Sequence, residues 1–342
     1  MATSTSSRPH PSPAIIFETL NAYQRTAALR AAIELNVFTT IADGNTTAAE
    51  IAHATQTSER GTRILCDYLT VMGFLGKNAG HYELSPESAL FLSRHSPAYL
   101  GTTAQFLGEM EEKMGAGKDM AQAVRQGGTT LPSDGTMSYD NPIWVTFARS
   151  MAPMMSMPAE KLALLAGAPE GRNSKVLDIA AGHGLYGIAV ARHNPNAHIV
   201  AVDWANVLDV AWENARQAGV ADRYSSIAGS AFDVDFGDGY DLVLLTNFLH
   251  HFSAARNEEL LKKICASMNP GGRVLTAEFI PNEDRVTPPV DAMFSMMMLT
   301  GTSEGDAYTF SEYETMFRNA GFARSELYQL SPLPNRAVVS YK

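Results

Sequence analysis

Two adjacent histidines, His250 and His251, follow an apolar segment in the sequence LLTNFLHHFS. A histidine at the end of a buried strand can accept a proton at neutral pH, because its ordinary pKa of about 6.5 leaves the imidazole largely neutral. A general base of this kind assists reactions in which a hydroxyl group becomes a nucleophile. Which reaction the histidines could assist therefore depends on the cofactor that the preceding segments of the chain bind beside them.

A glycine-rich turn lies upstream, in the sequence VLDIAAGHGLYG. Gly182, Gly184 and Gly187 have the spacing GxGxxG, and the turn leaves a predicted strand and opens a predicted helix. Asp203 ends the next predicted strand about 20 residues later, where an acid that binds ribose hydroxyls is expected. This combination predicts a cofactor that contains adenosine.

Asp178, which ends the first strand of this unit, distinguishes between two such cofactors. A nicotinamide dinucleotide places its pyrophosphate at the helix N-terminus, and a carboxylate that enters the turn would repel it. S-adenosylmethionine has no phosphate and carries a sulfonium and an ammonium group, both of which suit a neighbouring acid. The sequence therefore favours S-adenosyl-L-methionine over NAD.

The turn resembles the DxGxGxG motif of class I S-adenosylmethionine-dependent methyltransferases, with Ala180 at the position of the first glycine. From about residue 14 onward, the chain resembles the small-molecule O-methyltransferases of plants and bacteria that carry an N-terminal winged-helix dimerisation domain. The resemblance implies a homodimer, a small-molecule methyl acceptor and S-adenosyl-L-homocysteine as a product. It also implies that Gly182 and Gly184 let the backbone approach the methionine moiety, and that Asp203 binds the ribose.

The same resemblance assigns residues to the adenine. Trp204 and Phe232 would flank it, and Ser230 occupies the position at which the family often has an acid for the adenine amino group. Asn247 completes the expected cofactor-binding set, to which Asp178 also belongs.

An apolar pocket is expected to hold the acceptor. Aromatic residues and two methionine-rich segments are suited to such a pocket, because methionine adapts its shape to apolar ligands. The residues predicted to wall it are Trp144, Phe147, Met151, Met293 and Met297.

The family pattern L-H-D-W makes the first histidine the base, so His250 is expected to act as the base. His251 replaces the acid of the pattern, and it is either a second catalytic group or a locally packed residue. Glu278, which fits the spacing of the acid that orients the base in the family, is expected to orient His250. Ala307 lies where a second family acid belongs, which leaves C- or N-methylation of a small metabolite, such as an α-keto acid, as an alternative.

Strands that alternate with helices after Ser174 are needed to position these residues. The expected strands are KVLDIA, AHIVAVD, YSSIAG, YDLVLLTN and RVLTAEF, and ARSELYQL and RAVVSYK can then pair as an antiparallel hairpin. This pattern predicts an α/β fold with a Rossmann-like, seven-stranded class I methyltransferase sheet. Ligands of such sheets lie at the carboxyl ends of the strands where the strand order reverses, so His250 would lie beside the cofactor.

The N-terminal part reads as helix, turn, helix and wing, a winged-helix pattern. Between residues 14 and 100, six Lys and Arg residues face eight acids, so a dimerisation module is favoured over a DNA-binding one. We expect a disordered tail (1–13), a winged-helix dimerisation domain (14–105), a helical linker that contributes to the acceptor pocket (106–170) and a catalytic domain (171–342).

Composition narrows the partners. The net charge of −10 argues against nucleic acid, which requires a basic face. Cys66 and Cys265 lie far apart in sequence, so no disulfide framework or metal site is expected and a cytoplasmic location fits. The polar, proline-rich first residues are expected to form a tail and not a signal peptide, and no apolar run approaches the roughly 20 residues needed to cross a membrane.

The leading hypothesis is a homodimeric S-adenosylmethionine-dependent methyltransferase that acts on a hydroxylated aromatic or similarly apolar small molecule. Two further hypotheses are an NAD-dependent oxidoreductase and a regulator or scaffold that has kept the fold without catalysis. Binding of S-adenosylmethionine or NADH would distinguish the first two.

Overall fold

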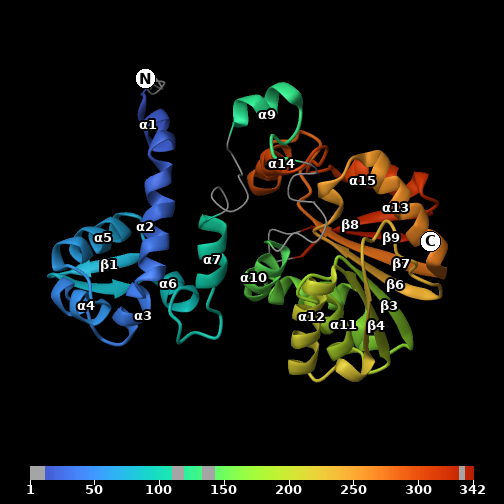
Figure 1. Cartoon of the computed structure of the whole chain (residues 1–342), viewed down its shortest axis with the longest axis horizontal. Helices are drawn as coiled ribbons and strands as arrows, with labels where there is room; N and C mark the ends of the chain where they lie inside the picture. Colours follow the sequence, from blue (N-terminus) through green and yellow to red (C-terminus); the bar gives the residue numbers. More distant parts are fainter. Residues whose placement is uncertain (1–11, 110–118, 133–142, 331–335) are drawn as a thin grey trace, which may run out of the picture. The chain divides into compact units, whose positions relative to one another are not determined.

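A computed structural model describes residues 12–109, 119–132, 143–330 and 336–342. The chain divides into two compact units, residues 1–108 and 109–342, each with a hydrophobic core of its own (Figure 1). Most of the segment predicted as a disordered tail, residues 1–11, lies outside the described residues. None of the described helices is both long enough and apolar enough to span a membrane.

The N-terminal unit is mainly helical, and its one described pair of strands forms an antiparallel hairpin between α5 and α6. Thr47 and Glu50 form a capping box at the start of α4, and the Ser58 hydroxyl accepts a hydrogen bond from Gly61 N at the start of α5. Its elements are α1 (Ala14–Leu20), α2 (Ala22–Glu34), α3 (Val37–Ala42), α4 (Ala48–Thr55), α5 (Glu59–Val71), β1 (Leu75–Asn78), β2 (His81–Leu84), α6 (Pro86–Phe91) and α7 (Gly101–Gly108).

The second unit begins with helices and continues as alternating strands and helices. Helices α10, α11 and α12 pack together below the sheet in Figure 1, and α13 and α15 pack together above it. The main elements are α9 (Met120–Gln126), α10 (Ile143–Leu165), β3 (Ser174–Ile179), α11 (Leu185–His193), β4 (Ala197–Asp203), α12 (Ala205–Gln217), β5 (Tyr224–Ala228), β6 (Tyr240–Thr246), α13 (Ala254–Ser267), β7 (Met268–Glu278), α14 (Pro289–Gly301), α15 (Phe310–Asn319), β8 (Arg324–Gln329) and β9 (Arg336–Tyr341).

The sheet has seven strands in the order β5-β4-β3-β6-β7-β9-β8, which confirms the predicted fold class. The first five are parallel, and β9 is antiparallel to both β7 and β8, as the predicted hairpin requires. The strand order reverses at β3, between β4 and β6. Since parallel strands end at the same edge, Asp203 of β4 and Glu278 of β7 lie at that edge with the residues that follow β6.

Candidate active site

The glycine-rich turn between β3 and α11 is held by the carboxylate of Asp203. Oδ2 of Asp203 accepts a hydrogen bond from Gly182 N at 2.8 Å, and Oδ1 accepts one from Trp204 N at 2.7 Å. Gly184 has a φ of 73°, and a Cβ there would lie 2.8 Å from the Tyr224 hydroxyl oxygen. Any larger residue at Gly184 would therefore strain the backbone and crowd a buried ring.

Asp178 lies beneath this turn and is fully buried. Its Oδ2 accepts a hydrogen bond from Gly187 N at 3.0 Å, whereas its Oδ1 has no partner among the described residues. Burial raises the pKa of Asp178 to about 7, and the nearby charge of Asp203 acts in the same direction. Burial likewise raises the pKa of Asp203 to about 6. Both carboxyl groups would be stabilised in their charged form by a cationic ligand.

A pocket of about 550 Å³ lies at this edge of the sheet. Four of the predicted cofactor residues line it: Asp203, Trp204, Ser230 and Phe232. The other four, Asp178, Gly182, Gly184 and Asn247, are not among its lining residues. Asn247 instead places its Nδ2 3.5 Å from the Tyr186 hydroxyl, which also donates to the sulfur of Met155.

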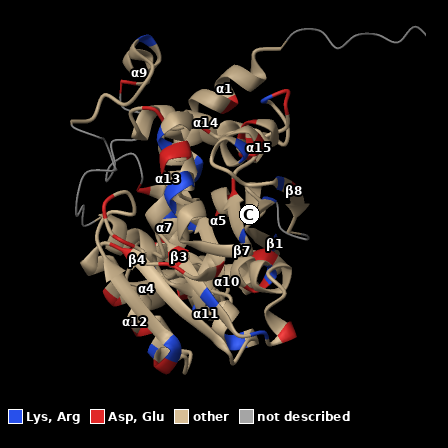
Figure 2. Ribbon diagram, turned by 90° about the vertical axis from the view of Figure 1, so that its right-hand side faces the viewer, with Lys and Arg blue, Asp and Glu red and all other residues tan. Residues whose placement is uncertain are grey.

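The pocket has a second wall from α13, which the sequence analysis did not identify. The guanidinium of Arg256 lies 4.2 Å from the centre of the Phe232 ring and pairs with Glu259 at 3.0 Å. Nζ of Lys263 donates to three carbonyl groups of the segment 231–234. Figure 2 shows basic and acidic residues following one another along α13. These contacts fix the segment that carries Ser230 and Phe232.

His250 and Glu278 form a buried pair at the ends of β6 and β7, with 3% and 1% of their surfaces exposed. Nδ1 of His250 lies 2.5 Å from Oε2 of Glu278. The other oxygen, Oε1, accepts hydrogen bonds from Phe248 N at 2.8 Å and Leu249 N at 2.9 Å. Because a carboxylate only accepts hydrogen bonds, Nδ1–H of His250 donates to Glu278, and the lone pair of the neutral imidazole lies on Nε2.

His251 packs beside this pair, with its ring centre 4.2 Å from that of His250 and 5.6 Å from that of Trp144. Burial lowers the pKa of His251 well below its usual value, and the neighbouring His250 acts in the same direction. Its Nδ1 is buried without a partner among the described residues, and the residue lines the pocket. His251 is therefore neutral at physiological pH and is a weaker base than an unperturbed histidine.

An aromatic wall covers the ring of His250. Phe294 of α14 meets it edge-on at 4.8 Å, and Phe279 stacks on Phe294 at 3.9 Å. Neither phenylalanine was predicted. Of the predicted acceptor residues, Trp144 contacts Phe147 at 5.4 Å, and Met151 of the same helix is 5% exposed.

The two predicted methionines of α14 are not buried. Met293 exposes 67% of its surface and Met297 exposes 38%. Successive residues on a helix point about 100° apart, so Phe294 contacts the ring of His250 whereas its neighbour Met293 points in another direction. The sequence pattern could not reveal this, because α14 is apolar on several faces.

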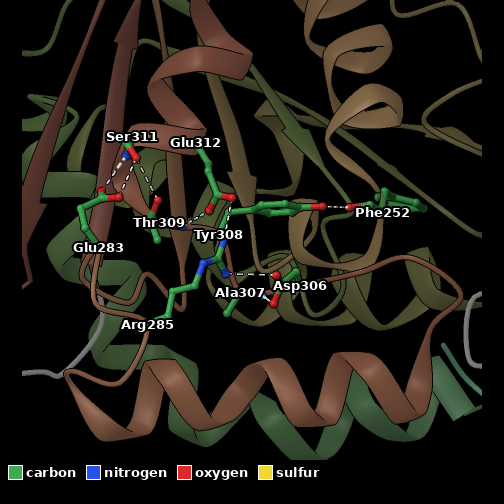
Figure 3. Close-up of polar contacts among 9 residues, drawn as sticks. All are labelled: Phe252, Glu283, Arg285, Asp306, Ala307, Tyr308, Thr309, Ser311 and Glu312. Carbon is green, nitrogen blue, oxygen red and sulfur yellow. Dashed lines mark hydrogen bonds and ion pairs between the residues drawn. The ribbon is translucent and has the colours of Figure 1, made fainter. Parts of the chain in front are cut away.

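The position at which the family has a second acid holds Ala307 in this chain. Ala307 is fully buried, and the neighbouring Asp306 pairs with Arg285 at 3.1 Å (Figure 3). Arg285 also reaches Glu312 at 2.5 Å. The remaining nearby acid, Glu304, lines the pocket. Asp306 is therefore occupied by a structural ion pair.

Comparisons with known proteins identify the family of the chain and agree with its fold. The model of an O-methyltransferase domain matches residues 135–323, and that of an O-methyltransferase dimerisation domain matches residues 17–94. The chain is 27% identical over 334 residues to 3-hydroxy-5-methyl-1-naphthoate 3-O-methyltransferase from Streptomyces sahachiroi, covering 96% of this chain and 95% of that protein.

Two solved structures are similar over almost the whole chain. A candidate O-methyltransferase from Nostoc punctiforme is 54% identical with a TM-score of 0.94, covering 97% of this chain and all of the other. Human N-acetylserotonin methyltransferase in complex with S-adenosylmethionine has a TM-score of 0.83 at 21% identity, covering 99% of each chain. The second likeness concerns the fold alone.

Proposed function

The chain belongs to the O-methyltransferase family, as an S-adenosylmethionine-dependent enzyme, and we propose that it methylates a hydroxyl group of an apolar aromatic small molecule with His250 as the general base. The observation that carries this proposal is the buried His250–Glu278 pair beside an aromatic wall. The similarity to a naphthoate O-methyltransferase supports an aromatic acceptor.

The residues of the pocket fit the cofactor. Bound S-adenosylmethionine supplies an electrophilic methyl group on a sulfonium. Asp203 presents its carboxylate to the pocket for ribose hydroxyls, and Trp204 and Phe232 offer apolar surface to the adenine. Gly182 and Gly184 keep the turn close to the ligand, and the unpartnered Oδ1 of Asp178 provides negative charge behind it.

His250 would accept the proton of the acceptor. A phenol with a pKa near ~10 is mostly protonated at neutral pH, so a positioned base increases the fraction that can attack. The proton would go to Nε2, and the carboxylate of Glu278 would stabilise the resulting imidazolium through Nδ1–H. Phe279 and Phe294 would exclude water and orient an aromatic ring.

A screen with labelled S-adenosylmethionine tests the proposal. The acceptors are 2-naphthol, catechol, 3-hydroxy-2-naphthoate and the keto acid phenylpyruvate, and the product is assayed for an O-methyl group. Methylation of at least one phenolic acceptor is expected. Transfer to carbon of phenylpyruvate alone, or tight binding of NADH without binding of S-adenosylmethionine in calorimetry, would refute the proposal.

Cofactor affinity is expected to depend on pH through Asp178. Because its pKa is raised to about 7 without ligand, the carboxyl is charged above that pH and neutral below it. A cationic donor binds the charged form better, so affinity should fall as pH drops from 8 to 6, by roughly 10-fold for the proton of Asp178. Asp203, whose pKa is raised to about 6, adds a smaller fall near pH 6 that Asp178→Asn should retain. Calorimetry at both pH values measures this. Asp178→Asn should bind more weakly at pH 8 and show a much flatter pH dependence, and a wild-type affinity equal at both pH values would contradict the assignment.

The dimerisation domain supports a homodimer, and we propose that α1 forms part of its interface. Ile16, Phe17 and Leu20 expose 59%, 59% and 66% of their surfaces, and α1 has no buried residue. Such exposure on one short helix is typical of a surface that a partner covers. Light scattering should give the mass of a dimer for the wild type and of a monomer for Phe17→Glu combined with Leu20→Glu. A double variant that stays dimeric would exclude this interface.

A cytoplasmic location is the remaining proposal. It is supported by Cys66 and Cys265, which are both buried and unpaired, as is usual for proteins of a reducing compartment. Fractionation of the producing cells tests it, and recovery outside the cytoplasm would contradict it.

A further inference from the structure

The residues 302–308, here called the support segment, pass directly against the turn that carries the two histidines. At Gly305, a Cβ would lie well within 3.0 Å of the carbonyl oxygen of His250 and at 3.0 Å from the carbonyl carbon of His251. Real Cβ atoms do not approach backbone this closely. The absence of a side chain at Gly305 therefore sets how near the support segment lies to the backbone of the base.

The support segment is fixed at its beginning. The Thr302 hydroxyl accepts a hydrogen bond from Gly305 N at 2.9 Å, and Thr302 O accepts one from Thr129 N at 2.9 Å. The Thr129 hydroxyl donates to Thr300 O at 2.7 Å. Thr129 lies outside the support segment and Gly305 lies inside it. These hydrogen bonds therefore hold the segment in place against the turn of His250 and His251.

The other end of the support segment is fixed as well, as Figure 3 shows. The Tyr308 hydroxyl donates to Phe252 O at 2.6 Å, directly after the histidines. Arg285 joins Asp306 to Glu312 through two ion pairs. The histidine turn is therefore held by Glu278 from one direction and by the support segment from another.

We propose that Gly305 is a positioning residue for the base, and that Tyr308 assists it through Phe252. This inference rests on the proposed function of His250. Proton transfer requires the base within about 3 Å of the acceptor hydroxyl. A shift of roughly 1 Å at a reacting group costs on the order of 100-fold in rate. A methyl group at Gly305 would meet the carbonyl oxygen of His250 and, at 2.6 Å, the hydroxyl oxygen of Thr302. The backbone of His250 and the support segment would therefore have to move apart, whereas Asp203 and the glycine-rich turn are not among the atoms that the methyl group meets.

The test compares Gly305→Ala with the wild type at pH 7 and pH 10, with whichever phenolic acceptor of the screen is turned over. At pH 7, kcat should fall by at least about 10-fold. This fall should exceed any change in the affinity for S-adenosylhomocysteine, which is measured alongside because Thr302, Glu304 and His251 line the cofactor pocket. At pH 10 the acceptor ionises without help, so the ratio of wild-type to variant kcat should shrink to about threefold. A merely destabilised protein would keep its deficit at both pH values.

Two further variants complete the design. Gly76→Ala is a matched control, because the added methyl meets only the movable side chain of Glu83 and kcat should be unchanged. Tyr308→Phe removes only the hydroxyl bond to Phe252 O, and it tests the support segment even if Gly305→Ala fails to fold. It should lower kcat several-fold at pH 7 with the same recovery at pH 10.

The outcomes separate the two proposals. Wild-type kcat in Gly305→Ala at pH 7, or a deficit in the folded variants that is the same at both pH values, would overturn the positioning role. If Gly305→Ala does not fold, wild-type kcat in Tyr308→Phe at pH 7 would also overturn it. Failure of the wild type to methylate any phenol would instead overturn the proposed function.

Discussion

Replacing His250 by alanine is expected to lower kcat at pH 7 by about 100-fold or more, with the affinity for S-adenosylhomocysteine unchanged within about threefold. The imidazole provides the lone pair that accepts the phenolic proton, and general bases contribute typically about 10²–10⁴-fold. The cofactor contacts predicted at Asp203 and the glycine-rich turn do not involve this ring. Steady-state kinetics and calorimetry measure the two effects separately.

A matched control for this variant is His198→Ala, which removes an exposed histidine of β4. Its kcat should equal that of the wild type. The deficit of His250→Ala should become smaller at pH 10, where the acceptor is partly ionised. Unchanged turnover of His250→Ala at pH 7 would remove this residue from the mechanism.

Replacing Glu278 by glutamine is expected to be of comparable severity. The carboxylate accepts on both oxygens at once: Oε2 from His250, and Oε1 from Phe248 N and Leu249 N. An amide has one oxygen and one NH₂ group, so it cannot accept on both sides. If its oxygen stays with the two backbone donors, its NH₂ group faces Nδ1 and forces the proton of His250 onto Nε2. The base is then present in the wrong tautomer.

The expected result for Glu278→Gln is a fall in kcat on the order of 100-fold or more at pH 7. If the amide rotates instead, the backbone donors Phe248 N and Leu249 N lose their partner, at a cost of about 1–3 kcal/mol in the free energy of unfolding. Kinetics and denaturant unfolding distinguish the two arrangements. A variant with wild-type kcat and wild-type stability would show that the pair serves neither purpose.

The sequence predicted the sheet well because its strands are short apolar runs bounded by turn residues. Asp203 and Glu278 end their strands in the sequence, and parallel pairing at β4, β3, β6 and β7 brings these ends to one edge. The resemblance to the methyltransferase family pointed to Glu278 as the partner of His250, and the structure has Nδ1 and Oε2 at 2.5 Å. Local pattern and topology were sufficient for the sheet, whereas the pair was inferred from the resemblance.

The features that could not be predicted depend on contacts between loops. Phe294 rather than Met293 faces His250, and this choice depends on the rotation of α14, which an all-round apolar sequence does not specify. Gly305 has no recognisable motif and no positive φ, so its role is visible only from its neighbours in the fold, the carbonyl groups of His250 and His251 and the hydroxyl of Thr302. Arg256 and Lys263 read as ordinary surface charges on an amphipathic helix until the segment 231–234 is seen beneath them.

The order of the last two strands bears on how the enzyme matures. β9 follows β8 in the sequence, yet it lies between β8 and β7 in the sheet. In the antiparallel pairing of β7 with β9, Arg336 of β9 lies opposite Glu278 of β7. Before residues 336–341 are in place, the β7 edge is open and β8 has no neighbour in the sheet. An unpaired edge exposes backbone donors and acceptors to strands of other molecules. A folding intermediate or truncated chain without β9 is therefore expected to aggregate more readily than the folded protein.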